Sequence, residues 1–75
     1  MISMNIRLKD IPDVRDFVDT VLHYDFEIDL ISGRYVVDAK SIMGIFSLNL
    51  AAPIKLEART DNPGDFEEKM KRFAV

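Results

Sequence analysis

Three short segments of the chain alternate hydrophobic with polar residues, and this period of two predicts β-strands. In the first segment the apolar positions are Ile2, Met4, Ile6 and Leu8. The other two alternating segments cover residues 26–30 and 54–58. Because each of these strands has one apolar and one polar face, we expect an antiparallel sheet that is covered on one side and wet on the other.

Between these strands the apolar residues recur every three or four positions, which is the spacing of helices packed on a core. After the first strand this stripe consists of Val14, Phe17, Val18, Val21 and Leu22. Asp10 is expected to cap this helix, because its carboxylate can accept the free backbone N–H groups of the first turn. A second helix is predicted over residues 41–49 and a third over residues 65–73.

A tight turn at Ser32-Gly33 is expected to join the second strand to a further strand over residues 34–37, because glycine adopts positive φ without steric cost. The elements then follow in the order β-α-β-β-α-β-α. This order predicts a single α+β domain over residues 1–75. We expect an open-faced β-sandwich, with a four-stranded antiparallel sheet and the helices on one face.

The composition limits the kind of partner. The chain has no cysteine, which excludes disulfides, thiolate metal ligands and thiol nucleophiles. No apolar run reaches the roughly 20 residues of a membrane span, so we expect a cytoplasmic protein without a membrane partner. The net charge of −3 argues against nucleic acid, because proteins that bind it concentrate positive charge on one face. We therefore expect protein partners, and the oligomeric state stays open.

The predicted second helix carries the first candidate site. Ser41 stands at its expected N-terminus, where backbone N–H groups and the helix dipole would stabilise a phosphate on the hydroxyl. Behind it lie more large apolar residues than one short helix can bury against a sheet, namely Ile42, Met43, Ile45 and Phe46. One or two of them are expected to be exposed and to dock a protein. Two simpler interpretations stay open, in which the serine is only an N-cap and the apolar stripe only core.

The other polar residues form no catalytic pattern. His23 is the only histidine, and it is expected at the end of the first helix, where a positive charge suits the dipole. Aspartates spaced by three along that helix fit a solvated face better than a metal site, and they are Asp10, Asp13, Asp16 and Asp19. Glycine-rich phosphate loops and nucleophile elbows are absent. We therefore expect no enzyme activity, no metal and no cofactor.

One segment is similar to a known family. Residues 39–44 read Ala-Lys-Ser-Ile-Met-Gly and resemble the region around the regulatory serine of HPr, the small phosphocarrier protein of the bacterial sugar phosphotransferase system. The chain length, the element order and the hairpin agree with this resemblance. In that family a dedicated kinase phosphorylates the serine, and the apolar residues after it dock the kinase, the phosphotransferase enzymes and a transcriptional regulator. The resemblance implies that Ser41 is the phosphoacceptor and that the docking residues are Ile42, Met43 and Phe46.

The resemblance fails at the family's active residue. HPr carries its phosphoryl group on a histidine that opens the first helix, in a segment reading Gly-Ile-His-Ala-Arg-Pro. Alignment without a gap places Asp10 at the histidine and Pro12 at the arginine. The resemblance thus predicts a binding or regulatory module that has lost phosphocarrier activity. Two alternatives stay open: a phosphocarrier that uses Asp10 or His23, and a small-ligand or dimerisation domain on the same fold.

Overall fold

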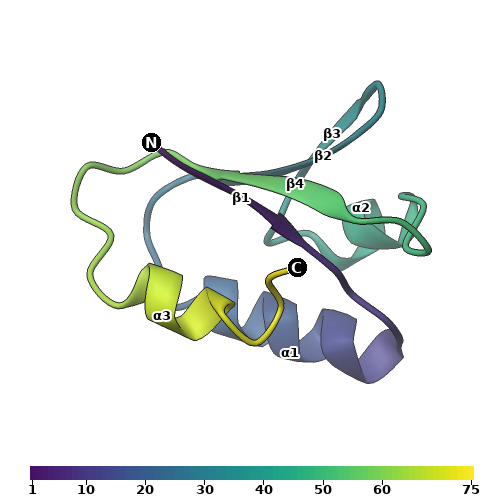
Figure 1. Ribbon diagram of the computed structural model, residues 1–75, viewed down its shortest axis with the longest axis horizontal. Helices are drawn as coiled ribbons and strands as arrows, with labels where there is room; N and C mark the ends of the chain where they lie inside the picture. The colour runs from purple at the N-terminus through teal and green to yellow at the C-terminus, as the bar shows by residue number, and fades with distance from the viewer.

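The computed structural model describes residues 1–75 and confirms the predicted order of elements. They are β1 (Ile2–Ile6), α1 (Ile11–Val21), β2 (Ile28–Ser32), β3 (Tyr35–Asp38), α2 (Ile42–Phe46), β4 (Ile54–Ala58) and α3 (Phe66–Met70). The strands form one antiparallel sheet in the order β1-β4-β2-β3, and α1 and α3 lie side by side against one face of it (Figure 1). None of the helices has the length and apolar character to cross a membrane. The predicted α+β open-faced sandwich is confirmed.

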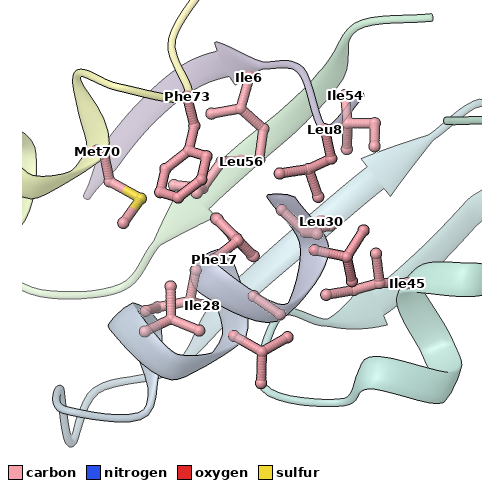
Figure 2. Packing of buried hydrophobic residues seen from close by; sticks show 14 of the residues in the cluster. Ile6, Leu8, Phe17, Ile28, Leu30, Ile45, Ile54, Leu56, Met70 and Phe73 are labelled. Atoms are coloured by element: carbon pink, nitrogen blue, oxygen red, sulfur yellow. The ribbon is translucent and has the colours of Figure 1, made fainter. Parts of the chain in front are cut away.

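The space between the sheet and the helices is filled by 17 buried hydrophobic residues. The strands contribute their inward faces, such as Ile6, Leu30 and Leu56, and α1 contributes Phe17 from the opposite side (Figure 2). Phe17 meets Phe73 edge to face, with 5.4 Å between the ring centroids. No polar or charged residue is buried. All candidate chemistry therefore lies at or near the surface.

The hairpin turn lies one residue later than predicted. Ser32 pairs with Tyr35, so Gly33 and Arg34 are the two turn residues. Gly33 has a φ of 60°, whereas Arg34 has no positive φ. This combination is that of a type II′ turn, which places glycine at the first central position. The hairpin was thus predicted correctly, and its turn was placed wrongly by one residue.

Helix α2 is shorter than predicted and ends at Phe46 instead of Asn49. The hydroxyl of Ser47 donates to the carbonyl oxygen of Gly44 at 2.6 Å. The side-chain oxygen of Asn49 accepts the backbone N–H of Ala51 at 3.1 Å. Such local side-chain bonds compete with the helix for backbone groups. They favour a loop after the five residues of α2.

Helix α3 also ends earlier than predicted, at Met70 instead of Phe73. The chain then returns to the sheet, where Ala74 forms a bridge with Ile6 and the N–H of Val75 donates to the carbonyl of Asn5 at 3.1 Å. This pairing covers the outer edge of β1. Helical periodicity alone does not predict it, because the partner is at the other end of the chain.

Three strands also have boundaries that differ from the prediction. Strand β1 ends at Ile6 and not at Leu8, β2 covers residues 28–32 and not 26–30, and β3 covers residues 35–38 and not 34–37. Phe26 packs its ring against Phe66, with 5.4 Å between the centroids. The apolar position before β2 therefore serves a contact with α3.

Candidate functional site

Ser41 lies immediately before α2 and acts as its N-cap. Its backbone is extended, with φ −101° and ψ 104°, and its Oγ accepts the backbone N–H of Gly44 at 3.2 Å. The backbone N–H of Ser41 donates to the carbonyl oxygen of Asp38 at 3.0 Å. The residue as a whole is exposed. Ser41 is therefore both a capping residue and a serine accessible from solvent.

Gly44 allows α2 to lie close against β3. A Cβ atom at this position would be 3.2 Å from the Oγ of Ser41 and 3.2 Å from the Cβ of Val37 on β3. A larger residue would push these groups apart and disturb the N-cap bond. Glycine costs a helix about 1 kcal/mol relative to alanine, and the close approach to β3 explains why it stands here.

The apolar residues of α2 divide between the core and the surface. Ile45 is fully buried, and Ile42 is partly buried against the core. Met43 and Phe46 face outward, with 78% and 43% of their surface exposed. Neighbouring exposed residues of this size are typical of protein-binding surfaces. We refer to Ile42, Met43 and Phe46 as the docking ridge.

Asp10 is the N-cap of helix α1. Its Oδ1 accepts the backbone N–H of Asp13 at 2.9 Å, and Oδ2 of Asp13 accepts the N–H of Lys9 at 3.0 Å. None of the ion pairs in the structure includes Asp10. Its carboxylate is therefore engaged in holding the first helical turn, without a paired cation.

His23 follows the opposite end of α1, about 20 Å from Asp10 at the helical rise of 1.5 Å per residue. Its Nδ1 lies 2.8 Å from the carbonyl oxygen of Asp19, so this nitrogen carries the proton and donates it. A shallow groove of about 370 Å³ beside the ring is lined by Asp19, Thr20, His23, Tyr24, Asp65 and Lys69. No three acidic or histidine side chains are grouped to hold a metal ion. Asp10 and His23 therefore form no common site.

Solved structures place this arrangement in a family. A crystal structure of HPr-C-His from Thermoanaerobacter tengcongensis matches with a TM-score of 0.75 and 32% sequence identity, over 95% of this chain and 84% of that one. The chain belongs to the HPr family. A crystal structure of the phosphocarrier protein HPr from Bacillus anthracis str. Ames has the same fold, with a TM-score of 0.69 and 23% identity over 97% of this chain and 92% of that one. By sequence, no family model and no curated protein matches.

Three hydrogen bonds of the Lys40 and Tyr24 side chains in this HPr-family chain were not predicted from its sequence. The Nζ of Lys40 donates to the carbonyl oxygens of Tyr24 and Phe26 at 2.7 and 3.1 Å. The Tyr24 hydroxyl donates to Oδ1 of Asp65 at 2.7 Å. The partners are 14, 16 and 41 residues apart in the chain, so no local pattern marks them. Together they connect the Ser41 turn to the end of α1 and the start of α3.

The Tyr24 contact predicts a loss of stability at alkaline pH. Burial, followed by the hydrogen bond and the negative charge of Asp65, raises the pKa of Tyr24 from 10.0 to about 12. The folded state therefore favours the neutral phenol. This stabilisation is complete below pH 10 and is lost as the pH rises from 10 to about 12.

A Tyr35→Phe variant makes this measurable, because it leaves Tyr24 as the only tyrosine, and phenolate absorbance then follows one group. We expect a midpoint near pH 12 for the folded protein and near pH 10 in denaturant. Asp65→Ala should lower the folded midpoint, whereas Glu67→Ala, which removes an exposed carboxylate of α3, should leave it unchanged. Equal midpoints for the folded and denatured protein would contradict the contact.

Proposed function

We propose that this HPr-family chain is a binding or regulatory module of the phosphotransferase system that has lost histidine phosphocarrier activity. Membership of the family supports a phosphocarrier-related protein with protein partners. The observation that carries the further step is that Asp10, which alignment without a gap places at the family's phosphorylated histidine, caps α1. The module would act by contact with other proteins and not by passing on a phosphoryl group.

The chemistry of the two side chains supports the loss. An imidazole nitrogen accepts a phosphoryl group and passes it on, whereas a carboxylate would form an acyl phosphate. Here Oδ1 of Asp10 already accepts the N–H of Asp13, and alignment without a gap places Pro12 at the family's arginine. Arg15, further along α1, takes part in no ion pair. No ion pair holds a cation at the carboxylate of Asp10, where the resemblance would require the family's arginine.

For the regulatory role, we infer that a serine kinase phosphorylates Ser41 and that Ile42, Met43 and Phe46 dock the partner proteins. The support is that an exposed serine stands directly before the docking ridge. A kinase bound to the ridge would reach the hydroxyl without unfolding the chain. The phosphate would add roughly two negative charges beside the ridge, and this would change which partners bind.

Ser41→Ala is expected to abolish phosphorylation by a serine kinase that acts on HPr proteins, supplied with labelled ATP. Ser47→Ala is the matched control, because Ser47 is an exposed serine at the other end of α2 and should leave labelling at the wild-type level. Mass spectrometry of the labelled peptides identifies the modified residue. If Ser41→Ala is labelled as well as wild type, the assignment of the site is wrong.

A further inference from the structure

A lysine side chain anchors the turn between β3 and α2. Lys40 directly precedes Ser41 and is partly buried, and its ammonium group donates to the carbonyl oxygens of Tyr24 and Phe26 at 2.7 and 3.1 Å. Both carbonyls belong to the connection between α1 and β2. Hydrogen bonds from a charged donor are stronger than those between neutral groups. The side chain therefore ties the Ser41 turn to a distant part of the chain.

The connection that receives the ammonium group is held by its own contacts. The rings of Tyr24 and Phe26 both meet Phe66 edge to face, with centroids 5.1 and 5.4 Å apart. The Tyr24 hydroxyl is also bonded to Asp65. The two carbonyl oxygens are thus fixed relative to α3, and they give Lys40 a rigid anchor.

Local hydrogen bonds shape the turn but do not attach its last residues to the rest of the molecule. The backbone N–H groups of Lys40 and Ser41 both donate to Asp38, at 2.8 and 3.0 Å. The N–H of Ala39 donates to the carbonyl of Ile28 on β2 at 2.9 Å. Beyond Ala39, the Lys40 ammonium group makes the hydrogen bonds that reach another segment. The orientation of Ser41 relative to the core therefore depends on this ammonium group on one side and on the packing of Ile45 on the other.

Lys40 bonds backbone carbonyl oxygens although carboxylates lie in the same groove. The groove beside it also contains Arg59 and four carboxylates, those of Asp25, Glu27, Asp29 and Asp38. Arg59 pairs with Glu27 and Asp29, at 3.2 and 2.9 Å, whereas Lys40 pairs with no carboxylate. Its ammonium group bonds two neutral carbonyl oxygens instead. Because the ammonium group is already bonded to the backbone of Tyr24 and Phe26, this geometry favours a structural role over binding of an anion from a partner protein.

We propose that Lys40 is a positioning residue for Ser41, and that its bonds to Tyr24 and Phe26 hold the serine in the one orientation that a kinase on the docking ridge can use. This inference rests on the phosphorylation of Ser41 proposed above. Displacement of a reacting group by about 1 Å can slow a reaction on the order of a hundredfold. Loss of the anchor should therefore slow phosphorylation even when the protein stays folded.

The test compares kcat/KM for phosphorylation of Ser41 in Lys40→Met with wild type, after circular dichroism has shown that each protein is folded. We expect a decrease of about tenfold or more. Lys40→Gln keeps N–H donors on a shorter side chain and should give an intermediate kcat/KM. It replaces Lys40→Met in the comparison if Lys40→Met does not fold. Met70→Ala is the control for lost stability alone, because Met70 is buried on α3. It should stay within twofold of wild type.

Hydrogen exchange at the amide of Gly44 gives a readout that needs no kinase, because this N–H donates to the Oγ of Ser41. We expect exchange in Lys40→Met to be about tenfold faster than in Met70→Ala. A wild-type phosphorylation rate in Lys40→Met, or equal slowing in Met70→Ala, would overturn the positioning role. If the wild-type protein is not phosphorylated, the proposed phosphorylation of Ser41 is wrong. The role of Lys40 is then tested by hydrogen exchange alone, and a Gly44 exchange rate in Lys40→Met equal to that in Met70→Ala would overturn it.

Discussion

Phe66→Ala is expected to lower the free energy of unfolding by about 3–5 kcal/mol. Phe66 opens α3 and is fully buried, and its ring meets those of Tyr24 and Phe26 edge to face. Truncation would leave a cavity and remove the contact that joins α3 to the connection between α1 and β2. Small domains have only about 5–15 kcal/mol of stability in total. This single contact therefore accounts for a large part of it.

Urea unfolding followed by circular dichroism measures this change. Phe46→Ala is the matched control, because it removes the same side chain from the docking ridge, where 43% of its surface is exposed. Its loss of stability should be about 1 kcal/mol or less, while its binding to the serine kinase should weaken. Equal losses of stability in the two variants would contradict the placement of Phe66 in the core and of Phe46 at the surface.

The period of the hydrophobic residues was sufficient to predict the fold, because any strand or helix that meets this core must be apolar on one face. The ends of the elements depend on bonds that the period does not contain. Helix α2 ends where Ser47 and Asn49 bond to nearby backbone groups. The chain leaves α3 to pair Ala74 with Ile6 at the edge of β1. Local competition decided the first boundary, and a long-range pairing decided the second.

The candidate site divides in the same way. Ser41 could be predicted as a cap because serine favours that position, and the exposure of part of α2 follows from having too many apolar residues for one short helix. The carbonyl partners of Lys40 could not be predicted, because the fold alone brings Tyr24 and Phe26 to its ammonium group. The sequence therefore indicates candidate residues for the site, and tertiary contacts decide how these residues are held.

The second large effect that we expect is the absence of phosphoryl transfer to this chain. The donor would be phosphoenolpyruvate, acting through the first enzyme of the phosphotransferase system. Alignment without a gap places Asp10 at the family's histidine, and the carboxylate of Asp10 accepts the backbone N–H of Asp13 at 2.9 Å. The only imidazole is that of His23, beyond the other end of α1. Its Nδ1 donates to the carbonyl oxygen of Asp19. Neither side chain is therefore a free imidazole at the start of α1.

The most direct test of the account is the intact mass of the protein after incubation with phosphoenolpyruvate and that enzyme. A phosphocarrier HPr, such as the one from Bacillus anthracis, serves as the positive control. The account predicts one added phosphoryl group on the control and an unchanged mass for this chain. A stable added phosphoryl group on this chain would contradict it. Loss of that group in Asp10→Asn or in His23→Ala would then identify the residue that carries it.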